Sequence, residues 1–378
     1  MQRFQLIATA AAGVEALVGK EVRDLGFDAR VENGRVRFEG TIADALRANL
    51  WLRIADRVKI VVGEFTATSF DDLFDQTKAL PWEDLLPLDA AFPVEGKSHN
   101  SALHHVPTVQ AITKKAIVER MLSAYHRRTR LPESGATYPL EVAIVKNRVL
   151  LTLDTSGASL FKRGYRVAKG PAPLKENLAA ALVSLAKWFP DRPFVDPVCG
   201  SGTIPIEAAL LGYNIAPGLN RSFSMERWVN LVPAGLSDDL RDQAMDAANY
   251  DQELKIYGYD IDGSMIEIAK QNARAAGLSQ AIEFKQLAVK DWRPSEENGT
   301  LVANPPYGER LSDQAAVREL YRQMGELYRP LTSWSKYILT ADLDFEKFYG
   351  APATKRRKLY NGALRTDLFQ YWGRPVKR

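Results

Sequence analysis

Asn304, Pro305, Pro306 and Tyr307 form a segment suited to recognising an amine, in LVANPPYGERL (residues 301–311). Two consecutive prolines cannot lie inside a sheet, so a rigid turn is expected after the preceding apolar strand. The Asn304 amide oxygen and the Pro305 carbonyl could accept both hydrogens of an exocyclic base amine, and Tyr307 could stack on the base. This would direct the nitrogen lone pair towards a methyl carbon by positioning alone, without a strong base. Taken alone, the segment could also be a turn that merely ends a strand.

A glycine-containing loop occurs earlier, in VDPVCGSGTIPIEAAL (residues 195–210). A strand delivers Asp196, the loop holds Gly200 and Gly202, and a helix follows, so backbone and helix N-terminus can approach a ligand closely. Pro205 stands where a dinucleotide fingerprint has its third glycine, and no Gly-Lys-Ser/Thr of a P-loop follows. A nucleoside whose carboxylate meets the loop fits this pattern; the alternative is an ordinary strand-to-helix turn.

Two further strands end in acidic residues. Asp260, in YGYDID (257–262), could accept both ribose hydroxyls of a nucleoside, and Asp262 is expected to cap the next helix. Asp260 lies far beyond the usual interval of about 20 residues after the glycine loop, which makes 213–254 an insertion. Asp291, in LAVKDW, could accept a hydrogen bond from an adenine amine.

Alternating strands and helices must position these groups. From residue 174 the pattern predicts strands at 193–198, 255–261, 282–289, 299–306 and 335–340, and helices at about 174–188, 203–212, 263–276 and 313–329. Nearly continuous apolar strands separated by helices indicate a parallel sheet covered on both faces. Ligands bind at the carboxyl ends of such strands, where all the segments above lie.

The first 155 residues predict two smaller α/β units. The first has strands at 4–8 and 35–40, a helix from Val14 and a helical apolar stripe after residue 41. The second begins near residue 61 and has a helix capped by Ser69, a long helix starting at Pro107 with a basic last turn, and a hairpin turning at 146–148. A segment rich in glycine, proline and basic residues follows at 156–173.

Composition excludes several classes of protein. The chain has 378 residues, a formal net charge of +4 and one cysteine, Cys199. A single thiol rules out a disulfide framework and a cysteine-based zinc site, and the four histidines lack a recognised ligand spacing, so no metal is expected. The start resembles no signal peptide, and no apolar run of about 18 residues could span a bilayer. A cytoplasmic protein without membrane association is therefore expected.

The motifs together resemble a known family. DPVCGSGT, GYDID and NPPYGERL, in this order, resemble class I S-adenosylmethionine-dependent amino-methyltransferases, and KSHNSALHHVPTVQAITKKAIVERML resembles a THUMP RNA-binding domain. SLFKRGYR (159–166), APLKENLAAAL (172–182) and RKLYNGALRTDLFQYW (357–372) resemble bacterial THUMP methyltransferases that make N2-methylguanosine in 23S rRNA. The similarity covers essentially the whole chain and is greatest to stand-alone proteins similar to the N-terminal half of the two-methyltransferase enzyme RlmL.

This resemblance implies an α/β fold. A Rossmann-like class I methyltransferase domain with a mostly parallel seven-stranded sheet would occupy 174–378. A ferredoxin-like domain (1–60), a THUMP domain (61–155) and a linker (156–173) would precede it. The implied reaction is transfer of a methyl group from S-adenosyl-L-methionine to the exocyclic N2 amine of a guanosine in RNA, most plausibly 23S rRNA.

The resemblance also assigns residues to the cofactor and the base. The methionine end of the cofactor would lie on the glycine loop, the ribose on Asp260 beside Ile261, and the adenine near Asp291. The guanine would be held from Asn304 to Tyr307, with Asn304 also beside the cofactor. The remaining expected cofactor-binding residues are Asp196, Cys199, Gly200, Ser201 and Gly202 of the loop and Lys175, Glu176 and Asn177 before the first core strand.

RNA would be bound through basic and polar side chains that together form an electrostatic footprint for phosphates. The expected contacts are Lys97, Ser98, Asn100, His104, Lys114 and Lys115 in the THUMP unit, Lys162, Arg163 and Arg166 in the linker, and Lys355, Arg356, Arg357 and Lys358 in the tail. The target guanine must leave its stack to reach Tyr307, so a flipped or unpaired base is expected.

Three other functions remain open at this point. The same machinery could act on a tRNA guanosine, or it could methylate adenine N6, because the Asn-Pro-Pro-Tyr turn also suits that amine. The chain could instead be a non-catalytic RNA-binding or ribosome-assembly factor that retains a methyltransferase fold. The intact glycine loop, Asp260, Asn304 and Tyr307 argue against the non-catalytic role.

Overall fold

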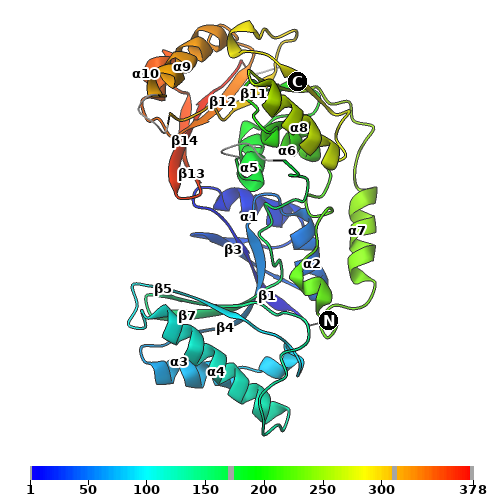
Figure 1. Cartoon of the computed structure of the whole chain (residues 1–378), viewed down its shortest axis with the longest axis vertical. Coiled ribbons are helices and arrows are strands. Elements are labelled where there is room, and N and C mark those ends of the chain that lie inside the picture. The colour runs from blue at the N-terminus through cyan, green and yellow to red at the C-terminus, as the bar shows by residue number, and fades with distance from the viewer. Residues whose placement is uncertain (1, 169–173, 309–312, 375–378) are drawn as a thin grey trace. The chain divides into compact units, whose positions relative to one another are not determined.

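The computed structural model describes residues 2–168, 174–308 and 313–374, which form two compact units (Figure 1). Unit 1 contains the residues up to Ala10, Gly19–Leu160 and Ser222–Gln243. Unit 2 contains Ala11–Val18, Phe161–Arg221 and the residues from Ala244 onward. The chain therefore passes between the units several times.

A continuous sheet organises unit 1. Its described strands have the order β2-β3-β1-β4-β7-β6-β5, and all neighbours are antiparallel except β5 and β6. The expected boundary at residue 60 falls inside β4, which pairs with β1 on one side and β7 on the other. The strands are β1 (Phe4–Thr9), β2 (Arg30–Glu32), β3 (Arg35–Gly40), β4 (Arg57–Thr66), β5 (Val94–His99), β6 (Leu140–Val145) and β7 (Arg148–Asp154).

Two helices of unit 1 begin close to the residues that the sequence predicts at their starts. Ser69 caps α3 (Phe70–Ala79) through a reciprocal box with Asp72, and Pro107 lies in the first turn of α4 (Val106–Ala124), as the sequence predicts. α3 and α4 pack on each other and on the β4–β6 part of the sheet, whereas α2 (Ile42–Trp51) packs on β3 and β4. α1 (Glu15–Asp24) divides between the units, and a short 3-10 turn, η1 (Trp82–Asp84), precedes β5.

Unit 2 is built on a mostly parallel sheet of the order β10-β9-β8-β11-β12-β14-β13 among the described strands. β8 to β12 run parallel, and β14 pairs antiparallel with both β12 and β13, which confirms the expected fold class. The strands are β8 (Phe194–Asp196), β9 (Ile256–Asp260), β10 (Ile282–Gln286), β11 (Thr300–Ala303), β12 (Ser335–Thr340), β13 (Lys355–Asn361) and β14 (Leu364–Tyr371).

Helices cover both faces of this sheet (Figure 1). α5 (Glu176–Ala186), α6 (Thr203–Gly212) and α8 (Gly263–Ala275) pack on one face, and α9 (Gln314–Tyr328) and α10 (Phe345–Tyr349) on the other. Tyr321, Met324 and Tyr328 of α9 are fully buried against Leu301 and Ile338 of the sheet. This core fixes α9 beside the carboxyl ends of β11 and β12.

The expected insertion at 213–254 returns the chain to unit 1. It contains the 3-10 turn η2 (Ser224–Arg227) and helix α7 (Leu236–Asp246), and residues 222–243 belong to unit 1. Trp228 is fully buried there: its ring stacks on Tyr138 with centroids 4.9 Å apart, and its Nε1 donates to the Thr137 carbonyl at 2.9 Å. The amide of Asn230 donates to the Leu85 carbonyl at 2.9 Å. Residues far along the chain thus complete the N-terminal unit.

No helix within the described ranges has both the length and the apolar character needed to cross a membrane.

Candidate functional site

Unit 2 contains a cavity of about 900 Å³ at the carboxyl ends of β8, β9 and β11. The glycine loop, the end of β9 and the Asn304–Tyr307 turn all line it, so the three motifs of the sequence meet at one place. The carboxyl edge of a parallel sheet is where α/β folds bind ligands, because loops from several strands converge there.

The glycine loop forms one wall of the cavity. Asp196, Cys199, Gly200 and Ser201 line the cavity, and Gly202, which begins α6, does not. Gly202 has φ = 81°, and a Cβ there would lie 2.9 Å from the Cβ of Ala269. Glycine is therefore required both by backbone conformation and by close packing of α6 on α8.

Asp260 connects β9 to this loop. Its Oδ2 accepts from the backbone N–H of Gly200 at 2.9 Å, and its Oδ1 accepts from that of Asp262 at 2.9 Å. Each carboxylate oxygen can accept more than one hydrogen bond, so Asp260 retains capacity for ligand hydroxyls. Ile261 is 72% exposed and also lines the cavity. The carboxylate of Asp262 accepts from the N–H of Ser264 at 2.8 Å, which confirms its role as the cap of α8.

Asp196 places a buried carboxyl group in the cavity. It is 1% exposed, and its Oδ1 accepts from the N–H of Val198 at 3.1 Å. Burial, with a contribution from the charge of Asp260, raises the pKa of Asp196 well above its usual value. A cationic group bound beside Asp196 would favour the ionised carboxylate. The cavity therefore has two carboxyl groups in its lining, at Asp196 and Asp260, which a cationic or hydroxyl-bearing ligand could contact.

The Asn304–Tyr307 turn forms the opposite wall. The Tyr307 hydroxyl donates to Asn304 Oδ1 at 2.5 Å. The Tyr321 hydroxyl donates to the Pro306 carbonyl at 3.0 Å and lies 2.8 Å from Thr340 Oγ1. Burial raises the pKa of Tyr321 to about 12, so its hydroxyl remains a donor at physiological pH. The turn is therefore held from α9 and β12 as well as by its two prolines.

The other expected cofactor-binding residues lie outside the cavity lining. Leu174 lines the cavity, whereas Lys175, Glu176 and Asn177 do not. On the side expected for adenine, Ala288, Val289 and Lys290 are the lining residues, and they overlap the 3-10 turn η3 (Val289–Asp291). Asp291 is exposed and is not among the residues that line the cavity, so the proximity of its carboxylate to the adenine stays a prediction. Its neighbours in the turn, Val289 and Lys290, do line the cavity.

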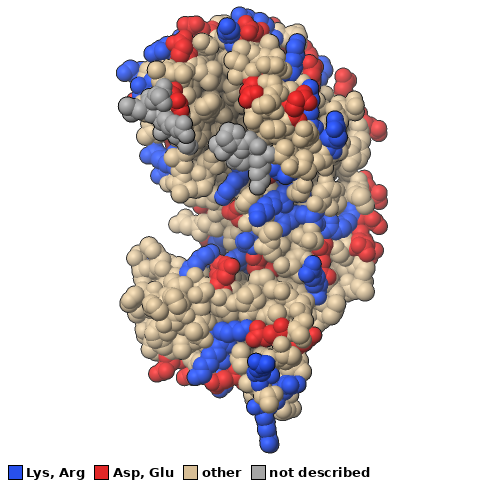
Figure 2. All heavy atoms as spheres, in the orientation of Figure 1, with Lys and Arg blue, Asp and Glu red and all other residues tan. Residues whose placement is uncertain are grey.

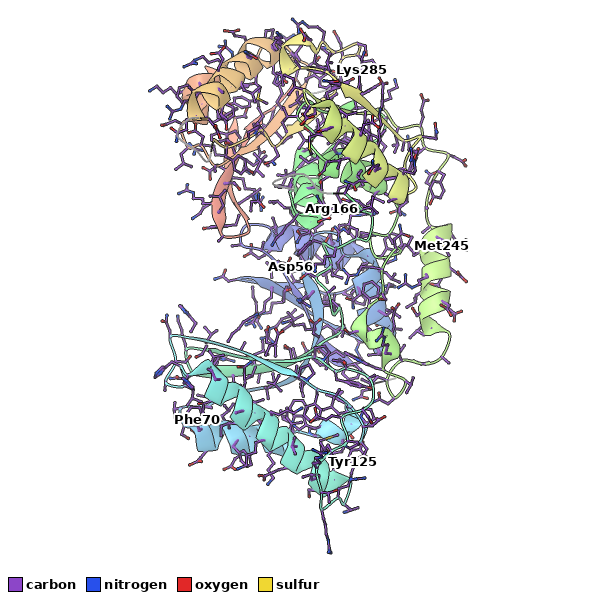
Figure 3. All side chains as sticks on the ribbon, viewed as in Figure 1. Asp56, Phe70, Tyr125, Arg166, Met245 and Lys285 are labelled. Atoms are coloured by element: carbon purple, nitrogen blue, oxygen red, sulfur yellow. The ribbon has the colours of Figure 1, made fainter. Side chains whose placement is uncertain are left out.

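Two linker arginines expected to contact RNA instead form ion pairs inside unit 2, where Arg163 is buried and Arg166 is partly buried. Arg163 is 2% exposed, and its guanidinium pairs with the fully buried carboxylate of Glu207 at 3.4 Å. Arg166, labelled in Figure 3, pairs with Glu176 at 2.7 Å and donates to the Leu174 carbonyl at 2.8 Å and to Thr203 Oγ1 at 3.1 Å. The prediction of RNA contacts is wrong for both, because each guanidinium is saturated inside unit 2. Their structural role is to hold the linker against α5 and α6.

The expected RNA-binding residues of unit 1 lie on the surface but have local partners. Lys97 pairs with Glu141 at 2.6 Å, Lys114 with Glu133 at 2.7 Å and Lys115 with Glu119 at 3.9 Å. The remaining three are Ser98, which donates to the Leu103 carbonyl at 2.6 Å, His104, whose Nδ1 lies 3.0 Å from the Ala102 carbonyl, and Asn100, which is exposed. Figure 2 likewise shows acidic side chains interspersed among the basic ones.

The basic residues of the linker and tail differ in availability. Lys162, Lys355 and Lys358 are exposed. Arg356 pairs with Asp367 at 2.6 Å, and Arg357 donates to the Gly13 carbonyl at 2.6 Å, both within unit 2. Within the described ranges, Lys162, Lys355 and Lys358 therefore form no ion pair with a carboxylate, although Lys358 Nζ lies 5.2 Å from the centre of the Tyr360 ring.

A cluster of arginines that was not singled out follows α4. Arg127, Arg128 and Arg130 are exposed, and within the described part of the chain none of them forms an ion pair with a carboxylate. In the sequence the run HRRTR (126–130) indicates only a basic end of the preceding helix. Its lack of acidic neighbours could not be seen in the sequence.

The sequence also missed the walls contributed by late elements. Asn361 and Leu364, from the β13–β14 hairpin, and Val317, Leu320 and Gln323, from α9, line the cavity. The three α9 residues carry no local motif. Asn361 and Leu364 lie in the segment 357–372 that carries the family resemblance, but the antiparallel return of β14 beside β12 is what brings the hairpin to the cavity. Among residues 2–168, 174–308 and 313–374, no group of three or more His, Cys, Asp or Glu side chains could hold a metal ion.

Three family models match the chain. The RMKL-like methyltransferase domain matches residues 163–370, the RlmL ferredoxin-like domain 5–59 and the THUMP domain 67–154.

Two curated relatives illustrate the similarity. The putative RNA methyltransferase YpsC of Bacillus subtilis is 52% identical over 99% of this chain and 97% of its own length. The ribosomal RNA large subunit methyltransferase K/L of Syntrophotalea carbinolica is 36% identical over 97% of this chain and 53% of its own length. This chain thus spans about half the length of the K/L proteins that it matches.

Two solved structures superpose closely. One, from Listeria monocytogenes and described as a predicted N6-adenine-specific DNA methylase, is 62% identical with a TM-score of 0.95, covering 99% of this chain and 97% of that one. The other, SMU.472, a putative methyltransferase complexed with SAH, is 52% identical with a TM-score of 0.95, covering 100% of both chains.

Proposed function

Because this chain belongs to the RMKL-like methyltransferase family and carries its ferredoxin-like and THUMP domains, we propose that it methylates the N2 amine of a guanosine in large-subunit ribosomal RNA. The chain is an S-adenosylmethionine-dependent RNA methyltransferase. The proposal adds the base, the atom, the class of RNA and the roles of individual residues. Action on ribosomal RNA would place the enzyme in the cytoplasm.

The residues of the cavity fit the methyl donor. Asp196 would receive the ammonium of its methionine end, the backbone at Gly200 and Ser201 would lie along that end, and Asp260 would accept from the ribose hydroxyls. The buried carboxyl of Asp196 supports this assignment, because no basic side chain among the described residues forms an ion pair with it and burial raises its pKa. When bound, the donor supplies a methyl group on a positively charged sulfur.

The Asn304–Tyr307 turn would hold the acceptor amine. Asn304 Oδ1 and the Pro305 carbonyl would each accept one N–H, which turns the nitrogen lone pair out of the ring and towards the methyl group. Tyr307 would stack on the base and exclude water from it. The N–CH3 bond would form as the S–CH3 bond breaks, the sulfur would keep that electron pair and become neutral, and the proton lost from the nitrogen would pass to solvent. These residues would act by orientation and preorganised hydrogen bonding.

One observation carries the proposal: the amine-binding turn and the carboxylates suited to the cofactor line the same cavity. A non-catalytic RNA-binding factor would not need Asp196, Asp260 and Asn304 to meet. The K/L names and the match to the RlmL ferredoxin-like domain favour ribosomal RNA over tRNA. The chain covers only about half of each K/L protein, so the modified nucleotide is not transferred from them.

The test is nucleoside mass spectrometry. The full chain and S-adenosylmethionine are incubated separately with unmodified 23S rRNA, 16S rRNA and tRNA, and the digested products are identified and mapped. N2-methylguanosine in 23S rRNA alone is the expected result. The same product in tRNA alone would move the substrate to tRNA, and no product from a cofactor-binding protein would require the same test on ribosome-assembly intermediates.

Adenine N6 methylation is the second candidate. The turn at Asn304 could hold either amine, and the printed description of the similar Listeria structure names an adenine-specific DNA methylase. N6-methyladenosine in the same experiment would establish this alternative. The THUMP domain argues for RNA rather than DNA as the nucleic acid.

A further inference from the structure

A second cavity, of about 420 Å³, adjoins the first in unit 2. The two share Tyr307, Val317 and Leu364 as lining residues, so the second cavity opens beside the residue expected to stack on the target base. Its lining includes one cationic and one anionic side chain, Arg318 from α9 and Asp342 from the segment after β12.

Arg318 and Asp342 lie side by side with unused hydrogen-bonding capacity. Arg318 Nε lies 3.9 Å from Asp342 Oδ2, which is close enough for attraction but too far for a hydrogen bond. Within the described part of the chain this Nε has no hydrogen-bond partner and is shielded from solvent. The guanidinium lies 4.7 Å from the centre of the Phe348 ring, which fixes its plane. Asp342 Oδ1 accepts from the N–H of Asp344 at 2.9 Å, which leaves Oδ2 for other donors.

A chain of hydrogen bonds ties Asp342 to the amine-binding turn. The Tyr321 hydroxyl donates to the Pro306 carbonyl at 3.0 Å and lies 2.8 Å from Thr340 Oγ1, which in turn accepts from the N–H of Asp342 at 3.1 Å. β11 and β12 are parallel neighbours, so both segments leave the same edge of the sheet. The carboxylate is therefore held in fixed relation to the turn.

We propose that Asp342 and Arg318 select guanine by reading the edge of the base next to its N2 amine. The proposal rests on the proposed function, and it goes further by assigning base specificity to residues outside the Asn304–Tyr307 turn. Guanine presents N1–H and O6 beside the N2 amine. The Asp342 carboxylate would accept from N1–H, and the Arg318 guanidinium would donate to O6.

The same pair disfavours adenine. Adenine has an unprotonated N1, which would direct a lone pair at the Asp342 carboxylate, and an amine in place of O6, which would meet the Arg318 donors. Leaving a buried polar group without a hydrogen-bond partner costs more free energy than a neutral contact gains. Mismatch at two atoms is therefore expected to discriminate strongly against adenine. The turn at Asn304 could hold the amine of either base, and Asp342 and Arg318 would determine which base is bound there.

The test uses a base analogue that keeps the 2-amine but exchanges hydrogen-bond donor and acceptor at N1 and at position 6. In 2,6-diaminopurine the 2-amine is retained, N1 is unprotonated and an amine replaces O6. A short RNA containing the nucleotide mapped above is made with guanine or 2,6-diaminopurine at that position, and single-turnover methylation of the two is compared. The wild-type chain is expected to prefer guanine on the order of 10- to 100-fold.

Two variants test the pair, each with a matched control. Asp342→Asn keeps an oxygen to accept from the Asp344 N–H but can donate to an unprotonated N1, so the guanine preference is expected to fall to below about threefold. Arg318→Gln is expected to reduce the preference as well. The control Asp344→Asn removes a charge from the turn that holds Asp342. The control Arg322→Gln removes a charge from helix α9, beside the same Phe348 ring that Arg318 contacts. Neither Asp344 nor Arg322 lines either of the two cavities described above.

The outcomes separate the two proposals. Loss of preference in Asp342→Asn but not in Asp344→Asn, with unchanged cofactor affinity as a check of folding, supports the assignment. A wild-type enzyme that methylates both RNAs equally, or an Asp342→Asn variant that keeps the full preference, overturns it while N2-methylguanosine formation stands. Absence of N2-methylguanosine from wild-type reactions with all three RNAs and with ribosome-assembly intermediates overturns both.

Discussion

Asn304 Oδ1 is the atom on which the proposed chemistry depends. It accepts from the Tyr307 hydroxyl in the structure, and in the proposed reaction it accepts from the target amine. An amide oxygen has two lone pairs, so both bonds can form at once, and the tyrosine would then orient the amide for the amine. In the proposed function, cofactor binding would depend instead on the loop at Asp196 and on Asp260.

Replacing Asn304 should therefore separate turnover from cofactor binding. Asn304→Ala is expected to lower the single-turnover rate by on the order of 100-fold or more, because a preorganised acceptor is lost, and to leave S-adenosylmethionine affinity within about threefold. Rapid-quench assays and calorimetry measure the two quantities. Tyr307→Phe, which keeps the ring, is expected to retain more activity than Asn304→Ala. Loss of cofactor affinity in Asn304→Ala would show that the assigned role is wrong.

Asp196 should make cofactor binding depend on pH. Its pKa is raised in the folded protein above the ordinary 3.8, so the folded state holds this proton more tightly than the unfolded state does. The unliganded protein accordingly loses stability as pH rises between the two values. A cationic ammonium favours the ionised form, so affinity should rise with pH up to the folded pKa.

Calorimetry in buffers of different ionisation enthalpy checks this linkage. Below the folded pKa, binding of S-adenosylmethionine should release a proton, and Asp196→Asn should abolish the release along with the pH dependence. Proton release that persists unchanged in the variant would assign the titration to another group.

At the scale of elements, β12 carries a buried charge that the reaction does not use. Lys336 is 4% exposed, its Nζ donates to the Leu331 carbonyl at 2.7 Å, and burial lowers its pKa from 10.5 to about 8. The unfolded state therefore binds this proton more tightly than the folded state. Stability should rise with pH between about 8 and 10.5.

Lys336→Met should remove the free-energy cost of burying the charged lysine side chain. The free energy of unfolding at neutral pH is expected to increase by about 1–3 kcal/mol, with part of the gain offset by the lost hydrogen bond to Leu331. Urea denaturation at neutral and alkaline pH measures it, and the wild-type and variant curves should converge at high pH. Lys347→Met, at an exposed position, serves as the control. A destabilised Lys336→Met would mean that the hydrogen bond outweighs desolvation.

The loop after α4 should contribute to RNA binding. Changing Arg127, Arg128 and Arg130 together to Gln is expected to weaken RNA binding and to reduce the slope of log affinity against log salt concentration by up to about 3. Filter binding over a range of salt concentrations measures this slope. The matched control changes Lys97, Lys114 and Lys115 to Gln, because these lysines already pair with carboxylates. A larger effect in the control would place the RNA on the expected residues instead.

The elements that could be predicted are those with strong local signals. Ser69, Pro107 and Asp262 mark helix starts where the structure has them, and the parallel strands of unit 2 follow from their apolar runs. Features that depend on distant partners could not be predicted. The sequence predicts that Arg163 contacts phosphate, and only the structure shows that it pairs with Glu207 of α6. Strand β13 begins with four basic residues, a composition that favours an exposed tail over the outermost strand of a sheet.

At the scale of the whole molecule, the cavity and the returning segment belong to different units. Every lining residue of the main cavity lies in unit 2, whereas residues 222–243 complete unit 1. Removing residues 1–160 would therefore strip the partners from Trp228 and leave an apolar segment exposed. A truncation that tests the N-terminal module must also replace 222–243 with a short linker.

Trp228 should be a major source of unit 1 stability. Trp228→Ala removes a fully buried ring stacked on Tyr138 and a hydrogen bond to Thr137, and it is expected to cost about 3–5 kcal/mol. Chemical denaturation measures the loss. Val229→Ala, at a position 89% exposed, is expected to change stability by less than about 0.5 kcal/mol. An equal effect of the two substitutions would show that the returning segment does not stabilise unit 1.

The return of residues 222–243 also sets an order of events at the ribosome. Unit 1 lacks its last segment until roughly 80 residues beyond Leu160 have been synthesised, which takes about 4–16 s at 5–20 residues per second. During that interval Tyr138 and the Leu85 carbonyl face water instead of Trp228 and Asn230. The nascent N-terminal module is then an incomplete fold with an exposed aromatic surface, a state that ribosome-associated chaperones bind. The unit that carries the THUMP domain, proposed to bind RNA, would therefore complete its fold only after residues 222–243 have been synthesised.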